Sequence, residues 1–292
     1  MTRFEDVLAG IRELRIQGAT SIARAGIEAL AEELARADGR ADVDALCARL
    51  FATRPNEPML RNLVHVYLAE LRRHGDGSPV AARSSAERLL SRLSADEARM
   101  AEVAARLVEG KQTVFTHCHS STVTRALRLA AERGARFTVY CTETRPRYQG
   151  RITARELAEA GIEVVQLVDS AALLGLRRAE VFLLGADAVL ATGFFINKVG
   201  SALLALAAER LEVPLYVCCH TAKFDLASLE GQDEPIEERD PAEVWPDASD
   251  GVLVRNPAFE RVPVHSIEAF VTEHGLLDLR GVQQAAANAL RA

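Results

Sequence analysis

The pattern of apolar residues changes at Lys111, and this change most limits what the chain can fold into. From that point, short β-rich runs alternate with amphipathic segments. The predicted strands are 113–115, 137–141, 163–167, 181–184 and 215–219, with further candidates at 252–254 and 267–271. The predicted helices are 123–133, 154–160, 170–175 and 199–210. Such alternation indicates a parallel sheet with helices on both faces, a Rossmann-like arrangement.

The chain before Lys111 is predicted to be entirely helical, because its apolar residues recur at helical spacing and no strand pattern interrupts them. The expected helices are 7–16, 22–37, 43–51, 60–74 and 80–109, and Gly110 ends the last of them. We therefore expect an α/β protein with two domains. Residues 1–110 form an N-terminal helical bundle, and residues 111–292 form a Rossmann-like sheet domain.

Composition excludes several classes of protein. The net charge of −6 argues against a general nucleic-acid-binding surface. No apolar run approaches the roughly 20 residues of a membrane span, and the first residues lack the apolar core of a signal peptide. The 5 cysteines are irregularly spaced, which is unlike a disulfide framework and favours a reducing compartment. We expect a cytoplasmic protein that binds neither nucleic acid nor membrane.

The first strand leads into a loop that carries a thiol and hydroxyl groups. Ligands bind parallel sheets at the carboxyl ends of the strands, so this loop is a candidate site. Cys118 and Ser120 lie in it, just before a predicted helix. A helix N-terminus presents unpaired N–H groups that bind phosphate and also favour a thiolate. The alternative is a structural cysteine beside an ordinary helix cap.

Polar residues follow the later strands as well. Asp187 comes after the apolar run 181–184, so its carboxyl group is expected at a partly dry edge with a raised pKa. Asn197 and Lys198 are expected to open the helix 199–210, and Lys223 follows the strand 215–219. The alternatives are a turn-capping aspartate and solvent-exposed lysines.

Other chemistries are less well supported by the sequence. His117, Cys118 and His119 resemble metal ligands, but adjacent residues on a strand point to opposite faces and do not readily close a tetrahedral site. No GxGxxG follows the first strand, and no GxSxG nucleophile elbow occurs. We therefore expect no metal and no cofactor.

Taken together, these segments resemble a known superfamily. The segments are Thr116-His-Cys-His-Ser120, Thr142-Glu-Thr-Arg-Pro146, Val168-Asp-Ser-Ala-Ala172, Gly185-Ala-Asp187, Ile196-Asn-Lys-Val-Gly200, Lys223-Phe224, Glu238-Arg-Asp-Pro241 and Asn256-Pro-Ala-Phe259. The superfamily contains ribose-1,5-bisphosphate isomerases, methylthioribose-1-phosphate isomerases and regulatory subunits of translation initiation factor 2B. The likeness runs in order over residues 111–275. It is thinner in the helical half, and it is greatest to the ribose-1,5-bisphosphate isomerases.

The resemblance implies particular roles for residues. Cys118 and Asp187 would be the catalytic pair. The implied substrate-binding residues are Gly18, Ala19, Arg54, Ser120, Arg145, Gln149, Asn197, Lys198 and Lys223. Arg145 and Gln149 would order the loop after 137–141 or reach the ligand. Gln17 stands where the family usually has arginine, and Asn56-Glu57 replaces residues that are usually small.

The resemblance also implies a reaction and an assembly. A neutral Asp187 would protonate the ring oxygen of a pentose 1-phosphate, and a Cys118 thiolate would move the proton from C2 to C1. Two helix N-termini, after Thr122 and after Lys198, would receive the two phosphates of ribose 1,5-bisphosphate. The alternatives are a methylthioribose-1-phosphate isomerase and a non-catalytic regulatory module. A homodimer or a trimer of dimers is expected.

Overall fold

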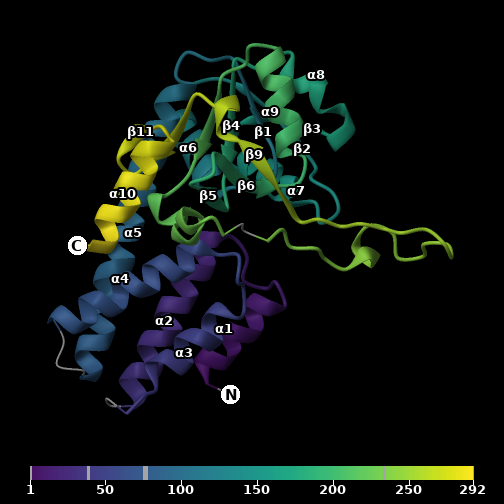
Figure 1. The fold of residues 1–292 in the computed structure, drawn as a ribbon. Coiled ribbons are helices and arrows are strands. Elements are labelled where there is room, and N and C mark those ends of the chain that lie inside the picture. The colour runs from purple at the N-terminus through teal and green to yellow at the C-terminus, as the bar shows by residue number, and fades with distance from the viewer. Residues whose placement is uncertain (1, 38–39, 75–77, 233–234, 292) are drawn as a thin grey trace.

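The computed structural model describes residues 2–37, 40–74, 78–232 and 235–291. A helical bundle at the N-terminus lies against the end of an α/β domain, and the C-terminal helix returns to the junction between them (Figure 1). This is the two-part α/β architecture predicted from the sequence. Over the described ranges, no helix is both long enough and apolar enough to cross a membrane.

The N-terminal part consists of helices at the expected places. They are α1 (Arg3–Arg12), α2 (Ala19–Ala37), α3 (Val43–Phe51), α4 (Pro58–His74) and α5 (Pro79–Val108). Local caps explain several of their starts, because the side chains of Thr2, Asp42 and Ser78 each accept a hydrogen bond from an N–H in the first turn. Pro79 opens α5, where a missing N–H costs nothing.

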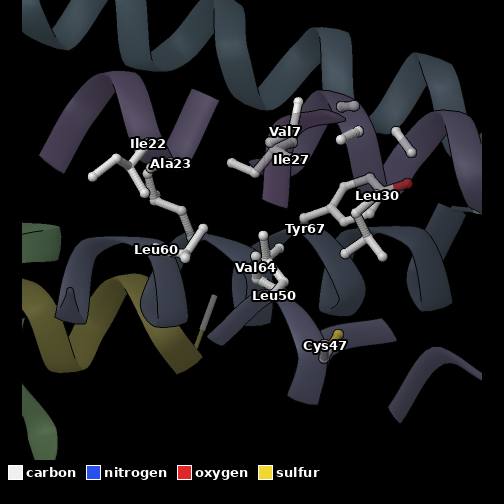
Figure 2. Packing of buried hydrophobic residues seen from close by; sticks show 14 of the residues in the cluster. Val7, Ile22, Ala23, Ile27, Leu30, Cys47, Leu50, Leu60, Val64 and Tyr67 are labelled. Carbon is white, nitrogen blue, oxygen red and sulfur yellow. The ribbon is translucent and has the colours of Figure 1, made fainter. Parts of the chain in front are cut away.

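The core of the bundle is built from the apolar faces of these helices. Figure 2 shows Ile27 and Leu30 of α2 packed toward Val64 and Tyr67 of α4, and all four are fully buried. The Tyr67 hydroxyl donates a hydrogen bond of 3.1 Å to the carbonyl of Ala82 in α5. A polar group buried in this core is therefore satisfied, and it ties α4 to α5.

The main sheet is mostly parallel. Its strands, in spatial order, are β11 (Gly275–Leu277), β10 (Ala269–Thr272), β7 (Leu215–Cys218), β4 (Val181–Gly185), β1 (Thr113–Thr116), β2 (Thr138–Thr142) and β3 (Glu163–Leu167). Among the described strands of this sheet, only β11 runs antiparallel to its neighbour. Counted along the chain, the parallel strands lie in the order 3-2-1-4-5-6 of doubly wound folds. The order reverses between β1 and β4, which marks the place where such sheets bind ligands.

Helices cover both faces of this sheet, as its alternating apolar residues require. On one face α6 (Ser121–Glu132) and α7 (Gln149–Glu159) pack with the second half of α5 against Val114 and Val139. On the other face α8 (Ala172–Leu176), α9 (Ser201–Arg210) and α10 (Leu279–Arg291) pack against Phe115 and Phe182. Neighbouring residues of a strand thus belong to different cores.

A second sheet was not predicted from the sequence. It has the order β8-β5-β6-β9, formed by β8 (Phe224–Asp225), β5 (Ala188–Leu190), β6 (Phe194–Lys198) and β9 (Phe259–Pro263). The predicted strand at 252–254 is wrong, because these residues form no strand. The candidate at 267–271 corresponds to β10. Helix α10 was also missed, although Leu279, Val282 and Ala286 are spaced as one apolar helix face.

Helix α5 belongs to both parts of the molecule. Leu89 and Leu93 are buried in the core of the bundle, whereas Ala101, Ala104 and Val108 are buried beneath the main sheet. The apolar cores therefore meet inside this helix. The domain boundary at residue 110 stays a prediction. A boundary at that residue places all of α5 in the first domain, although both cores contain part of this helix.

Candidate active site

A cavity of about 250 Å³ lies at the carboxyl ends of β1 and β4, next to the bundle. All the predicted site residues except Arg145 line it. They come from distant parts of the sequence, namely the starts of α2 and α7, the segment before α4, the loops after β1 and β4, strand β6 and the turn after β7. The structure therefore brings the predicted residues together in one place.

Cys118 is held in an unusual backbone conformation in the loop after β1. Its φ of 65° lies in the left-handed region, which non-glycine residues rarely adopt. The Cys118 N–H donates to Thr144 Oγ1 at 3.0 Å, and the Cys118 carbonyl accepts from Thr153 Oγ1 at 2.9 Å. Helix α6 begins shortly afterwards, with Ser120 as its N-cap. Strained residues held by surrounding hydrogen bonds are concentrated at functional sites.

The ionisation state of Cys118 differs from the one expected from the sequence. Burial raises the pKa of the Cys118 thiol to about 11, although the charge of Lys198 acts in the opposite direction. This raised pKa favours the protonated thiol at neutral pH over the thiolate expected from the sequence. The physical reason is that removal of the sulfur from water outweighs the nearby positive charge.

Asp187 follows β4, as predicted, at the edge where that strand ends. Burial raises the pKa of the Asp187 carboxyl group, as the sequence suggested. Lys223, Lys198 and Arg54 lower the pKa and so favour the carboxylate. Three cations act on Asp187, whereas among the main causes of the Cys118 shift Lys198 is the cation that lowers the pKa of the thiol.

Asn197 and Lys198 line the cavity, but they do not open a helix. They are the last residues of strand β6, and α9 begins at Ser201 after Gly200, whose φ is 103°. The Asn197 side chain donates to Ser201 Oγ at 2.9 Å. Lys198 Nζ lies 4.8 Å from the centre of the Phe259 ring, and among the described residues it has no carboxylate partner within ion-pair distance. Lys198 therefore offers a cation to the cavity.

Two helix N-termini do meet at the cavity, but the second belongs to α2 and not to α9. Residues 18–21 and 120–122, at the starts of α2 and α6, line the wall. Gly18 has a φ of 82° and opens α2. The first backbone bond of that helix runs from Ile22 to Gly18, so the N–H groups of residues 19–21 have no partner within the helix. Both ends can bind an anion.

Arg54 and Lys223 are partly engaged by the protein itself. Arg54 Nη2 donates to Glu237 at 2.9 Å, and Lys223 Nζ donates to the carbonyl of Ala186 at 2.6 Å. Arg54 also lies over the Phe259 ring, with its guanidinium carbon 5.7 Å from the ring centre. These contacts orient both cations beside Asp187.

Arg145 and Gln149, predicted to order their loop or reach a ligand, differ in position. Arg145 lies outside the cavity, where it donates to the Tyr148 hydroxyl at 2.7 Å and to the Val244 carbonyl at 3.0 Å. It therefore orders the loop after β2. Gln149 lines the cavity, and its buried Oε1 accepts no hydrogen bond from the described residues.

Several cavity residues were not proposed as ligand contacts from the sequence. They are Gln17, Thr20, Ser21, Glu57, His119, Ser121, Thr122, Ile152, Gly185, Ala186, Arg239 and Phe259. The hydroxyl groups of Thr20 and Ser21 directly follow Gly18 and Ala19, so a helix start could have been recognised there. Phe259 begins strand β9 of the second sheet, and the Arg239 N–H donates to the Asn256 carbonyl in the segment that precedes this strand.

The fold and this cavity define an α/β protein in which a thiol, a carboxyl group and several cationic side chains line one pocket next to a helical bundle. The chain belongs to the initiation factor 2 subunit family, whose model matches residues 15–279. A ribose 1,5-bisphosphate isomerase from Archaeoglobus fulgidus is 36% identical over 276 residues, which cover 91% of this chain and 87% of that protein.

Other members of the family are also similar. A methylthioribose-1-phosphate isomerase from Pelotomaculum thermopropionicum is 33% identical, with 94% of this chain and 83% of that protein covered. The crystal structure of translation initiation factor eIF-2B from Pyrococcus horikoshii superposes with a TM-score of 0.81 at 30% identity, covering 94% of this chain and 97% of that one. The family therefore includes both enzymes and initiation-factor proteins.

Proposed function

We propose that the protein is an isomerase that converts ribose 1,5-bisphosphate to ribulose 1,5-bisphosphate. The observation that carries this proposal is the pairing of Cys118 with Asp187 in a single cavity, flanked by the N-termini of α2 and α6. An aldose–ketose isomerisation needs an acid and a base in one site, and a bisphosphate needs two places for anions. The similarity to ribose 1,5-bisphosphate isomerases supports the same substrate.

The ionisation of the pair favours a division of roles opposite to the one expected from the sequence. We assign Cys118 as the acid, because its thiol keeps its proton at neutral pH. To ionise a group with that pKa at pH 7 would cost roughly 5 kcal/mol. We assign Asp187 as the base, because Lys223, Lys198 and Arg54 oppose the burial that raises the pKa of its carboxyl group.

The reaction then balances as follows. The Cys118 thiol protonates the ring oxygen as its bond to C1 breaks, and Asp187 removes the proton from C2, which gives an enol phosphate. Asp187 returns its proton to C1, and the hydroxyl on C2 gives its proton to the Cys118 thiolate as the ketone forms. Both groups end in their starting states, so the cycle needs no further proton donor.

A methylthioribose-1-phosphate isomerase is the second candidate, because a relative of that name is 33% identical. Its substrate has one phosphate and an apolar thioether. A thioether beside the N-terminus of a helix leaves polar groups without partners, which is costly in a buried site. The bisphosphate is therefore the better match to a cavity with anion sites at α2 and α6.

The test is turnover of both sugars by the purified protein. We expect kcat/KM for ribose 1,5-bisphosphate to exceed that for methylthioribose 1-phosphate by at least about a hundredfold, which corresponds to about 2.7 kcal/mol. Cys118→Ser and Asp187→Asn should each remove activity without a change in the circular-dichroism spectrum. Comparable rates on the two sugars would favour the methionine-salvage type of enzyme. No turnover of either would favour a regulatory role.

We also propose a homodimer as the smallest assembly and a cytoplasmic location. Leucines on adjacent helices support the dimer, because Leu174 of α8 and Leu203 of α9 are 61% and 71% exposed. The helices α8 and α9 pack side by side (Figure 1). Large apolar side chains gathered on one surface are typical of an interface between protein chains. The free thiols of all five cysteines are consistent with a reducing compartment.

A further inference from the structure

Glu57 is a buried acid that the proposed reaction does not use. It precedes Pro58, the first residue of α4, and lines the same cavity as Cys118 and Asp187. Only 2% of its surface is exposed. Glu57 Oε1 lies 3.6 Å from Arg54 Nε, which is too long for a good hydrogen bond. Glu57 Oε2 is buried and accepts no hydrogen bond from any residue that the structure describes.

An unpartnered oxygen at this place is costly for the folded protein. A buried polar group without a hydrogen bond typically destabilises a protein by about 1–3 kcal/mol. Two neighbours, Asp187 and Glu237, carry charge of the same sign as an ionised Glu57, whereas the charges of Arg54 and Lys223 act in the opposite direction. Arg54 is shared, since its Nη2 already donates to Glu237 at 2.9 Å. Burial, followed by the charge of Asp187, raises the pKa of Glu57 to about 8.

We propose that Glu57 Oε2 makes a hydrogen bond to one of the two free hydroxyls of the pentose, on C2 or C3. This inference rests on the proposed function, because it takes the hydroxyls from the proposed substrate. Only one oxygen of Glu57 is available, since the other faces Arg54. Glu57 is then a specificity-determining residue that the bundle contributes to the cavity.

A hydroxyl is the chemical group that fits this position best. It can accept from a protonated carboxyl group or donate to a carboxylate, so it suits Glu57 in either state. A phosphate oxygen would be repelled by the ionised acid, and an apolar chain would leave Oε2 unsatisfied. A site that binds a hydroxyl in this way rejects analogues that lack it.

The experiment compares sugars that lack one hydroxyl. The substrates are ribose 1,5-bisphosphate and its 3-deoxy analogue, and the 2-deoxy analogue is measured as a competitive inhibitor. Glu57→Leu removes the hydrogen bond at similar volume, whereas Glu57→Gln keeps it. Glu70→Gln is the matched control, because Glu70 is also a buried carboxylate of the bundle but pairs with Arg92 at 3.0 Å, outside the cavity.

We expect Glu57→Leu to lower kcat/KM for ribose 1,5-bisphosphate by about a hundredfold. For one of the two deoxy analogues the change should be less than about threefold, measured as kcat/KM for the 3-deoxy sugar and as the inhibition constant for the 2-deoxy sugar. Glu57→Gln should stay within about tenfold of the wild type, since an amide still forms the bond. Glu70→Gln should match the wild type on every sugar. The analogue that is not affected by Glu57→Leu lacks the hydroxyl that Glu57 contacts.

If Glu57→Leu weakened the activity or binding of all three sugars equally, or of none of them, the proposed contact would be refuted. A wild-type protein that does not isomerise ribose 1,5-bisphosphate refutes the proposed function instead. In that case the affinities of wild type and Glu57→Leu for the three sugars are compared by calorimetry. Equal affinities of the two proteins for every sugar would then overturn the inference as well. A loss of affinity in Glu57→Leu that spares one deoxy analogue would support it.

Discussion

Neighbouring charges and burial act differently on the two reactive side chains. Cys118 is shifted toward its neutral form by burial, with Lys198 acting against the shift. Asp187 experiences the same kind of burial but has Lys223, Lys198 and Arg54 around it. The sequence predicted which residues meet, because each follows a strand of a parallel sheet. It predicted the raised pKa of Asp187 but not the raised pKa of Cys118, because desolvation depends on how completely the bundle covers the cavity.

The state of Cys118 can be tested by chemical labelling. Only the thiolate reacts with iodoacetamide, so a thiol with a pKa of about 11 reacts slowly at pH 7. We expect the labelling rate to rise about tenfold per pH unit between pH 7 and 9. Cys118→Ser is the control, because the other four cysteines are buried. A labelling rate that is already constant above pH 7 would mean that the thiolate predominates.

The role of Asp187 predicts how activity depends on pH. A base must be ionised, so kcat/KM should fall as the pH drops through the raised pKa of Asp187. Lys198 lowers that pKa, and Lys198→Met should therefore move the acidic limb of the profile to higher pH. Titration of the substrate phosphates affects both proteins equally, so the difference between the two profiles is informative. An unshifted limb would argue that another group is the base.

At the scale of elements, the helices and the parallel strands could be predicted, and the second sheet could not. The five N-terminal helices are long and strongly periodic. Strands β5 and β8 have three and two residues, which is too short for a recognisable alternation. Asn197 and Lys198 were misplaced because they end strand β6, and helix α9 begins only after Gly200.

Helix α7 approaches strand β2 so closely at Gly150 that any larger residue there should destabilise the protein. A Cβ atom at Gly150 would lie 1.7 Å from the Thr142 carbonyl oxygen, which is backbone and cannot rotate away. We expect Gly150→Ala to destabilise the protein by about 3 kcal/mol or more, measured by urea unfolding. Gly134→Ala is the control. It has a φ of 95° but no atom within 4 Å, so it should cost only about 1–2 kcal/mol. Equal effects would show that α7 moves without penalty.

At the scale of the whole molecule, the proposed dimer predicts which surface substitutions change the assembly. Leu203 and Leu206 of α9 are 71% and 55% exposed. Leu203→Glu with Leu206→Glu should convert the dimer to a monomer of 31.7 kDa in light scattering, because charge in an apolar interface is costly. Val80→Glu, at the far end of α5 and 74% exposed, should leave the dimer intact. A wild-type monomer at micromolar concentration would contradict the proposal.

Helix α5 determines where a chimera of this protein and a relative can be joined. Its first half packs with Leu30 and Tyr67 in the bundle, and its second half packs under Val114 of the main sheet. A junction at residue 110 would transfer the sheet domain without the helix that covers part of its face. A junction inside α5 would join halves of this helix from two parents, although the two cores meet within it. A recombinant protein should therefore inherit α5 and both of its cores from one parent, and exchangeable segments are to be sought among surface loops instead.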